Sequence, residues 1–278
     1  MKLVQIWKYP VKSMLGARVP SAELSEDGVV GDRQWAIRDE LRGAIASGRK
    51  LAGLNRLAAS PATSGDGVTI TLPDGTAVTA TDVDANERLS AAIGHPVTLW
   101  SKPPATQLDH WQKGTPDSDD MMTEVRGIFG RLEDEPLPDF SIFPPAMFEY
   151  EYTPGHYYDC FPLMIMTTSA IRSLQAALPD SAVDERRFRP SLVIDTGDAD
   201  GHPEFDWSGR TLRIGATELT LGAKCPRCVV VTREFGVDLP ADRQVLRHIV
   251  RDLDQNVGIY ATVSTAGPIN VGDSVEFV

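Results

Sequence analysis

Cysteine is scarce in this sequence, with three thiols, Cys160, Cys225 and Cys228, among 278 residues. So few cysteines exclude a disulfide scaffold and are typical of a reducing compartment. A structural zinc site needs about four ligands, usually from a second Cys-x-x-Cys or a His pair, and neither accompanies Cys225 and Cys228. A thioredoxin-type Cys-x-x-Cys opens a helix after a strand, which is not the order of elements expected here.

Long apolar runs and an excess of positive charge are also absent. No run reaches the roughly 18 apolar residues of a membrane helix, and the first residues, MKLVQIWKYPVKS, lack the pattern of a signal peptide. Lysine and arginine number 27 against 39 aspartates and glutamates, a net charge of −12, which argues against a nucleic-acid or anionic-membrane surface. We therefore expect a cytoplasmic protein with neither nucleic acid nor membrane among its partners.

Apolar residues make up 42% of the chain, which is enough for an ordinary core. Short runs of β-branched and apolar residues alternate with frequent turns, and Asp74-Gly75 marks the clearest hairpin because this pair supplies the positive φ of a tight turn. The expected strands lie at residues 3–7, 22–24, 33–38, 68–72, 77–80, 97–100, 163–166, 192–194, 212–214, 218–221, 259–263 and 274–278.

Helical spacing is confined to three stretches, at residues 84–93, 170–178 and 238–252. Asp84 is spaced from Glu87 as in a capping box, and Thr168 or Ser169 is the expected N-cap of the second helix.

The pattern predicts a mainly β fold of the α+β class, with two packed β-barrel units and few helices. We place the first unit at residues 1–100 and the second at 101–278. The stretch from about 101 to 158 is rich in Pro, Asp and Ser, and we interpret it as a long irregular connection within the second unit.

The stretch Gly222–Arg233, GAKCPRCVVVTR, carries the most reactive chemistry. Cations beside a thiol lower its pKa by stabilising the thiolate, which is the form that attacks electrophiles and binds soft metals. Lys224, Arg227 and Arg233 are the cations here. The apolar run at 229–232 predicts a buried strand, with Cys228 held at the turn before it. On this window alone, a purely structural buried cysteine is an equal alternative.

A second group of residues has the chemistry of a phosphate site. Arginine offers a planar fork, lysine a point charge and serine a neutral donor, and hydroxyls at a helix start add anion-binding capacity. Taken singly, each is most simply a surface residue, but together with the cysteine they favour a phosphorylated cofactor bound through sulfur. The members are Lys12, Ser13, Arg33, Thr168, Ser169, Arg187 and Arg189.

Five short motifs, in the order YPVKS, GDRQW, FRP, CPRCVVVT and VGDSVEF, resemble the MOSC family, the molybdenum-cofactor sulfurase C-terminal domain proteins. The likeness is to the two-part form, in which a MOSC-associated β-barrel domain precedes the MOSC domain, as in the amidoxime-reducing components and their bacterial relatives. It covers nearly the whole chain apart from residues 101–158. It implies that the two units at 1–100 and 101–278 are these two domains.

The resemblance also implies roles for individual positions. Cys228 would be the catalytic residue and the direct molybdenum ligand, with Cys225 in a less constrained place. The other residues implied to bind the cofactor are Lys12, Ser13, Arg33, Thr167, Thr168, Ser169, Arg189, Ser191 and Arg227. Ser191 replaces the family's asparagine and has a shorter reach. The segment 45–49 departs from the family pattern, which leaves its contact with substrate open.

By the same resemblance, the chain would bind the molybdenum cofactor, a molybdopterin, and reduce small N-hydroxylated or N-oxygenated compounds. Three cysteines are too few for an iron–sulfur cluster besides the molybdenum ligand, and no Gly-x-Gly-x-x-Gly follows a strand. We therefore expect a separate ferredoxin-, flavin- or haem-type redox partner. Pyridoxal phosphate binding is a further term associated with the family as a whole. The alternative function is a molybdenum-cofactor carrier, or a sulfur carrier that holds a persulfide on Cys228.

Overall fold

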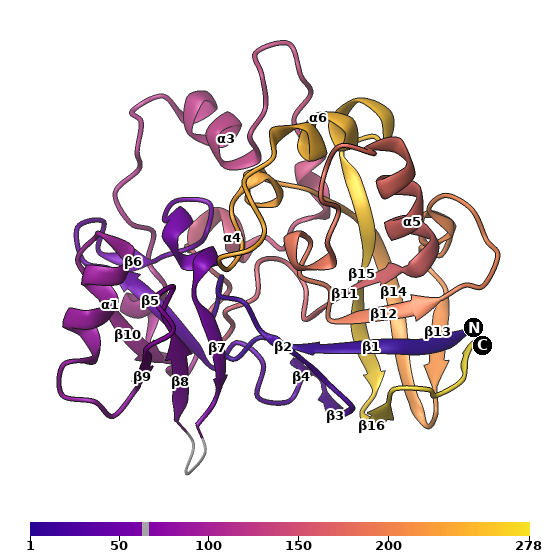
Figure 1. Ribbon diagram of the computed structural model, residues 1–278, viewed down its shortest axis with the longest axis horizontal. Helices are drawn as coiled ribbons and strands as arrows, with labels where there is room; N and C mark the ends of the chain where they lie inside the picture. The colour runs from indigo at the N-terminus through magenta and orange to yellow at the C-terminus, as the bar shows by residue number, and fades with distance from the viewer. Residues whose placement is uncertain (63–66) are drawn as a thin grey trace.

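The computed structural model describes residues 1–62 and 67–278 (Figure 1). The strands are β1 (Lys2–Lys8), β2 (Ala17–Val19), β3 (Ser21–Ser25), β4 (Gly28–Val29), β5 (Trp35–Asp39), β6 (Ala44–Ile45), β7 (Ala58–Pro61), β8 (Val68–Thr71), β9 (Ala77–Thr79), β10 (Val97–Ser101), β11 (Leu163–Thr167), β12 (Leu192–Asp195), β13 (Thr211–Ile214), β14 (Thr217–Pro226), β15 (Asn256–Thr265), β16 (Gly267–Asn270) and β17 (Val275–Phe277). The α-helices are α1 (Ala85–Ile93), α2 (Leu108–Trp111), α3 (Met121–Phe129), α4 (Ala146–Glu149), α5 (Thr168–Ala177) and α6 (Arg243–Asp252). The 3₁₀ helices are η1 (Ala52–Arg56), η2 (Phe140–Ile142), η3 (Glu185–Arg187), η4 (Pro203–Asp206) and η5 (Val229–Thr232).

The largest element is an eight-stranded sheet with the order β17-β13-β14-β15-β11-β12-β1-β2. Its first strand in the sequence, β1, pairs antiparallel with β12, so the start of the chain completes a sheet made mostly by its second half (Figure 1). Among the described residues this sheet does not close into a barrel. A single bridge joins Lys2 to Ser274, which brings β17 near β1. The prediction of a mainly β fold is confirmed, while the closed barrel is not found.

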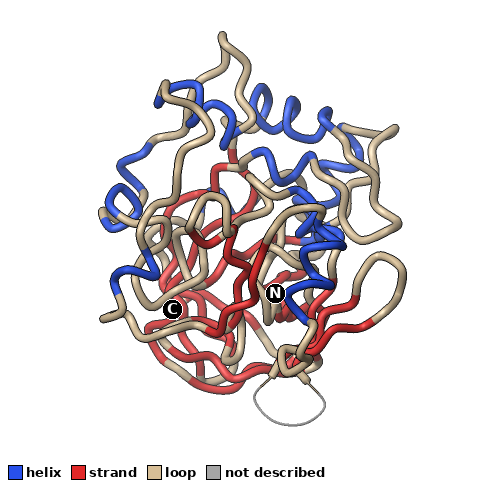
Figure 2. The backbone as a smooth tube through the Cα atoms, turned by 90° about the vertical axis from the view of Figure 1, so that its left-hand side faces the viewer, coloured by secondary structure: helices blue, strands red, loops and turns tan. Residues whose placement is uncertain are grey.

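Two of the buried apolar clusters lie in different halves of the molecule. One lies within the large sheet and includes Leu3, Ile165 and Ile259, all fully buried. The other joins the three-stranded sheets β10-β5-β6 and β7-β8-β9 with α1, around residues such as Ile37 and Leu89. Most helices lie together toward one end of the molecule, away from the bulk of the strands (Figure 2).

Residues just after β1 cross from one half to the other. β1 belongs to the large sheet, but Val11 and Met14 are fully buried in the second core. Val11 also bridges to Trp35, and the Lys12 amide donates to the Trp35 carbonyl oxygen at 2.8 Å. This crossing places the segment between Val11 and Met14 at the junction of the two halves.

Most of the expected strands are confirmed, including the hairpin β8–β9, but four details are wrong. Residues 229–232 form a 3₁₀ helix rather than a strand; a short apolar run has no period that separates the two. Asp84 precedes α1 without a side-chain cap, and the N-cap of α5 is Thr167. The connection at 101–158 contains three short α-helices, of which α3 has nine residues.

Within the described ranges, no helix has both the length and the apolar character that crossing a bilayer requires.

Candidate functional site

A cavity of about 120 Å³ lies at the junction of the two halves. Its walls come mainly from six parts of the chain that are distant in sequence: the turn after β1, the turn before β5, the loop at 47–49, the segment at 158–162, and the regions around residues 187–189 and 225–231. The residues singled out in the sequence that line it are Lys12, Ser13, Arg33, Arg187, Arg189, Cys225, Arg227 and Cys228.

The cavity wall is strongly basic in an otherwise acidic chain. Of the described residues that line it, six are basic and one, Asp159, is acidic, whereas the whole chain has a net charge of −12. Clustered cations with low-dielectric walls favour an anionic ligand. The six basic residues are Lys12, Arg33, Arg49, Arg187, Arg189 and Arg227.

The backbone is strained at three of the lining positions. Ser13, Arg33 and Arg189 have φ values of 64°, 46° and 55°, in the left-handed region, which costs roughly 1–2 kcal/mol for a residue with a Cβ. Arg189 also precedes Pro190, a place that normally favours extended backbone. Five non-glycine residues of the described chain have positive φ, so three of them gather at this one cavity. Such clustering is characteristic of ligand-binding sites.

Lys12 is 4% exposed and its ammonium donates to the Tyr157 carbonyl oxygen at 2.8 Å and to Asp159 at 2.7 Å. Burial lowers the pKa of Lys12 to about 8, although Asp159 acts in the opposite direction. Asp159 is 48% exposed and also pairs with Arg49 at 3.3 Å. Burial alone would raise the pKa of Asp159, but Arg49 and Lys12 outweigh it and hold that pKa well below its ordinary value.

Arg189 is the least satisfied cation of the cavity. Its guanidinium lies over the Tyr9 ring at 4.2 Å and donates through Nη1 to the Met14 carbonyl oxygen. Its Nη2 is buried and has no hydrogen-bond partner in the described parts of the chain. Burial, and then the charge of Arg33, lower the pKa of Arg189 to about 10. A buried donor without a partner is costly, so this nitrogen is suited to an anion that enters the cavity.

All three cysteines line the cavity, but their environments differ. Cys225 is 4% exposed, and its Sγ accepts a hydrogen bond from Arg227 Nη1 at 2.9 Å. Burial raises the pKa of Cys225 despite that cation, so the expectation of a lowered pKa is wrong for this residue. Burial also raises the pKa of Cys160 to about 12. Cys228 is the partly exposed thiol, and Arg49 and Arg227 line the same cavity.

Local structure explains why Cys228 is accessible. β14 ends at Pro226, and the Arg227 amide donates to the Gln255 carbonyl oxygen at 2.8 Å. Arg131 from the region after α3 donates to the Arg227 carbonyl oxygen at 3.0 Å. The chain then turns into η5, with Cys228 as its N-terminal flanking residue. Strand end and helix start therefore meet at Cys228, which leaves its side chain at the cavity wall.

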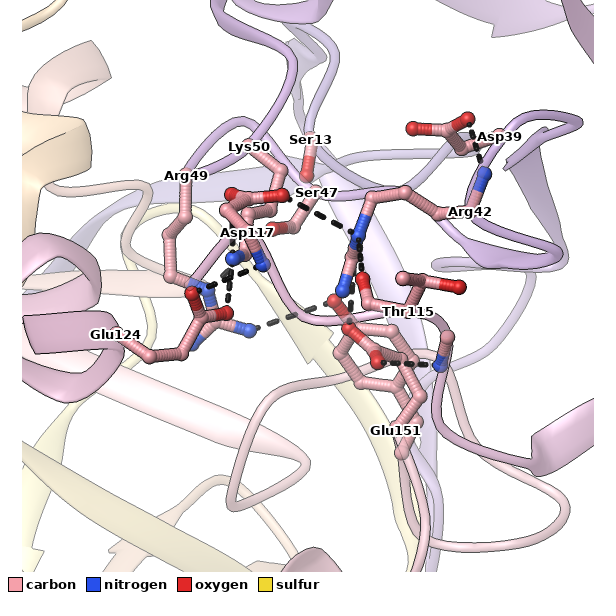
Figure 3. Close-up of polar contacts among 12 residues, drawn as sticks. Ser13, Asp39, Arg42, Ser47, Arg49, Lys50, Thr115, Asp117, Glu124 and Glu151 are labelled. Carbon is pink, nitrogen blue, oxygen red and sulfur yellow. Dashed lines mark hydrogen bonds and ion pairs between the residues drawn. The ribbon is translucent and has the colours of Figure 1, made fainter. Parts of the chain in front are cut away.

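The loop at 47–50 connects the cavity to the segment at 101–158 (Figure 3). The Gly48 amide donates to Ser13 Oγ at 2.9 Å, and Arg49 lies near the Tyr152 hydroxyl at 3.3 Å. Lys50 extends to α3 and its preceding turn, where it pairs with Glu124 and, at 2.6 Å, with Asp117. The loop is therefore held from both sides, with Arg49 in the cavity wall.

The structure does not bring four of the expected cofactor residues to this cavity, because their hydroxyls have other partners. Thr167 caps α5 and donates to the buried Glu204 at 2.7 Å, Ser169 lies 3.1 Å from Thr167, and Thr168 donates to Asp195 at 3.0 Å. Ser191 Oγ accepts from the Met164 amide at 3.3 Å. Lys224, expected beside the thiols, instead lies over the Phe205 ring at 4.8 Å.

Other cavity residues were not among the sequence-predicted ones. Asp159 and Cys160 stand alone in the sequence, directly after the segment at 101–158 that we interpreted as irregular. Asn55, which lines the cavity and is fully buried, is likewise part of no motif. The adjacency of an acid and a thiol at 159–160 is a weak signal, and only the fold places these two residues in the same cavity wall as Cys228.

Comparison with protein families finds two matches. Residues 1–107 match the MOSC N-terminal beta barrel domain, and residues 153–276 match the MOSC domain. The segment between these matches includes α2, α3 and α4.

Among curated proteins, the chain is 24% identical to mitochondrial amidoxime reducing component 2 of Bos taurus, over 98% of this chain and 81% of that protein. It is 25% identical to mitochondrial amidoxime-reducing component 1 of Homo sapiens, over 98% of this chain and 82% of that protein. The component 2 protein of Macaca fascicularis is 29% identical over 43% of this chain, and that alignment spans 38% of its length. A solved structure, the YUAD protein from Bacillus subtilis, is 9% identical with a TM-score of 0.42, and the match covers 99% of this chain and 94% of that one.

Proposed function

This chain is a MOSC-domain protein with a MOSC N-terminal β-barrel domain, and on that premise we propose that it is an oxidoreductase that binds a molybdenum cofactor in the cavity at the junction of the two halves. The observation that carries the proposal is the convergence there of strained, basic residues and one accessible thiol, Cys228. The proposed substrates are small N-hydroxylated or N-oxygenated compounds, because relatives over nearly the whole chain are named amidoxime reducing components.

The residues present suit the phosphate end of such a cofactor. Arg33 and Arg189 offer guanidinium forks, Lys12 a point charge and Ser13 a hydroxyl, which together form a complete donor set for a phosphate. The unpartnered Nη2 of Arg189 would gain its missing acceptor. The left-handed backbone at Ser13, Arg33 and Arg189 aims these side chains before any ligand arrives, so that less is lost in ordering them.

Entry of the ligand requires an exchange of ion pairs. Asp159 already pairs with Lys12 and Arg49, and the cavity of about 120 Å³ is small beside the roughly 300–1,000 Å³ of typical ligand sites. Because Asp159 is half exposed, it can turn toward solvent as the anion takes its place. The low pKa of Asp159 keeps it ionised, so its function would be to orient and to balance charge rather than to donate a proton.

Cys228 is the proposed metal ligand, since thiolates are preferred by soft, thiophilic metals. The bound cofactor would supply the two-electron chemistry that cleaves the N–O bond of the substrate. Arg227 would hold Cys225 in place through its 2.9 Å hydrogen bond and leave Cys228 as the reactive sulfur. Arg49, which lies in the wall near Asp159, would contact the substrate.

The test is metal analysis of the purified protein together with pterin fluorescence after oxidation, followed by benzamidoxime reduction with reduced viologen as the donor. We expect molybdenum and pterin in equal amounts and turnover of the substrate. Molybdenum and pterin without turnover would favour a cofactor carrier. Labile sulfane sulfur without metal would favour a persulfide carrier.

A further inference from the structure

Two buried side-chain atoms in the wall of the cavity at the junction of the two halves have no hydrogen-bond partner in the described parts of the chain, and their chemistry is opposite. One is Arg189 Nη2, a donor that we assign to the phosphate. The other is Asn55 Oδ1, which can only accept hydrogen bonds. A buried acceptor without a partner is costly, as is a buried donor without one. A ligand that satisfies this wall therefore offers an acceptor at one place and a donor at another.

Asn55 lies in η1, the short 3₁₀ helix that follows the loop at 47–50. Its neighbour Leu54 is buried in the apolar core of the first half, while Asn55 itself is fully buried in the cavity wall. The Asn55 carbonyl oxygen accepts from the Gly236 amide at 3.0 Å, and its side-chain Nδ2 donates to the Ala52 carbonyl oxygen at 3.3 Å. The bond from Nδ2 identifies the other side-chain atom as the oxygen. The side chain is therefore held with its acceptor available.

Gly48 keeps space open against the amide group of Asn55. Both residues line the cavity, and a Cβ at position 48 would lie 2.4 Å from Asn55 Oδ1. Gly48 is not among the residues with positive φ, so its backbone conformation does not require glycine. What requires glycine is the space beside the Asn55 amide, which any larger side chain would fill. The chain thus leaves room next to an unpartnered acceptor.

The group that pairs with Asn55 is not the part of the ligand that the cations hold. Phosphate oxygens and sulfur ligands accept hydrogen bonds, and an acceptor that faces Oδ1 is repelled. The partner of Oδ1 is therefore a hydrogen-bond donor elsewhere on the bound molecules. Under the proposed function, two of these molecules carry N–H donors on an N–C=N unit. They are the pterin of the cofactor and an amidoxime substrate, whose amino group is next to the N–O bond.

We propose that Asn55 is a ligand-recognition residue, and that its Oδ1 accepts a hydrogen bond from the N–H group of an N–C=N unit. This inference rests on the proposed function. The N–H group belongs either to the pterin or to the substrate. A site built to pair such a group rejects analogues that lack it, because its buried acceptor then stays unpaired. If the substrate is the partner, Asn55 selects amidoximes over N-oxygenated compounds without an N–H group.

The first measurement is the pterin content of the purified protein and its variants. Asn55→Leu removes the acceptor at similar size, and Asn55→Asp keeps an oxygen at this position. Asn270→Leu is the control, because Asn270 is exposed and outside the cavity. If the pterin carries the donor, Asn55→Leu should contain several-fold less pterin per protein than the parent. Asn55→Asp and the control should contain as much as the parent.

The second measurement is the Kd of benzamidoxime and of N,N-dimethylbenzamidoxime, which lacks the amino N–H groups. Calorimetry without an electron donor keeps both compounds from being reduced. If the substrate carries the donor, the parent should bind benzamidoxime roughly 10-fold more tightly than the dimethyl analogue, the usual effect of one buried hydrogen bond. Asn55→Leu should lose this preference with its pterin content unchanged. Asn55→Asp and Asn270→Leu should keep the preference.

Unchanged pterin content together with an unchanged preference in Asn55→Leu would overturn this inference and leave the proposed function intact. Equal losses in Asn55→Leu and Asn55→Asp would also overturn it, because packing at position 55 would then be the cause. A parent protein that contains no pterin and binds no benzamidoxime would overturn the proposed function as well, so the two failures are distinguishable.

Discussion

Arg227 Nη1 lies 2.9 Å from Sγ of Cys225 and donates to it, while Cys228, three residues further along the chain, remains partly exposed at the cavity wall. The same guanidinium donates to the Phe188 carbonyl oxygen, so Arg227 is fixed on both sides. Within this single Cys-x-x-Cys sequence, the Cys225 thiol is therefore buried and hydrogen-bonded to Arg227, whereas the Cys228 thiol is accessible.

The first prediction concerns these two thiols. Cys228→Ala should abolish both molybdenum binding and benzamidoxime reduction, because it removes the accessible sulfur ligand. Cys225→Ala should retain much of both, although the buried Arg227 loses an acceptor. Molybdenum content and turnover are measured on the same samples. The opposite pattern, with activity lost in Cys225→Ala and kept in Cys228→Ala, would exchange the two roles.

The second prediction is that Arg189 favours ligand binding at the expense of stability. Its buried Nη2 lacks a partner among the residues that the structure describes, and its charge is close to that of Arg33, so Arg189→Met should lower cofactor occupancy. Without ligand, the same change should raise the free energy of unfolding by about 1–2 kcal/mol, since an uncompensated buried charge is removed. Denaturant unfolding and pterin content are the two readouts.

Arg33→Ala is the companion variant, because Arg33 is paired with Asp32. It should also lower cofactor occupancy, but without the gain in stability. Full cofactor occupancy in both variants would contradict the phosphate assignment, and a loss of stability in Arg189→Met would contradict the trade-off.

The third prediction concerns pH and Lys12. With a pKa of about 8 in the folded protein, Lys12 loses its charge as the pH rises through 8, so anion binding should weaken there. Sulfate is a suitable probe because its charge is constant over this range. The Kd for sulfate should rise between pH 7 and pH 9.5, and this rise should be absent in Lys12→Met.

Loss of the Lys12 proton weakens anion binding but stabilises the folded chain. Lys12 binds its proton less tightly in the folded chain than in the unfolded chain, where its pKa is 10.5. The contribution of Lys12 to the free energy of unfolding therefore increases as the pH rises from about 8 to 10.5.

The sulfate titration decides the prediction. If the Kd for sulfate does not change with pH in the parent protein, Lys12 does not titrate at the site in this range.

The fourth prediction is that the protein needs an external electron donor. An iron–sulfur cluster commonly takes four cysteine ligands, and the sequence has three cysteines in all. Benzamidoxime reduction by the purified chain should therefore be negligible with NADH alone and should begin when reduced viologen is added. A ferredoxin-, flavin- or haem-type partner would take the place of viologen in the cell. Turnover with NADH alone would rule the prediction out.

The fifth prediction tests the loop that holds Arg49. A Cβ at Gly48 would lie 2.4 Å from Asn55 Oδ1, and Asn55 is fully buried. Gly48→Ala should therefore displace the loop from Ser13, lower the free energy of unfolding by about 1–3 kcal/mol and impair substrate reduction. Gly53→Ala is the matched control, because its nearest neighbour would be Ile93 at an ordinary 3.5 Å. If the two variants have the same free energy of unfolding, the prediction is wrong, because the contact with Asn55 is then relieved without loss of stability.

Local chemistry made much of the fold and part of the site predictable from the sequence. Short runs of apolar and β-branched residues predicted β1, β8 and β10, and Asp74-Gly75 predicted the β8–β9 turn, because strand and turn preferences act between near neighbours. The basic residues of the site were visible by type. Lys12, Arg33 and Arg189 could be singled out as phosphate donors, since a chain of net charge −12 has few reasons to cluster cations.

Tertiary structure decided the rest, because packing between distant segments determines burial, strain and pairing. It placed Cys160 and Asp159 in the cavity wall, far in sequence from Cys228. It raised the pKa of Cys225 by burial where sequence neighbours suggested the reverse. It also directed the hydroxyls of Thr167 and Ser191 into local hydrogen bonds. The sequence shows which residue types could act together. The free energy that holds them at one site comes from packing between segments distant in the sequence, and no local pattern encodes that packing.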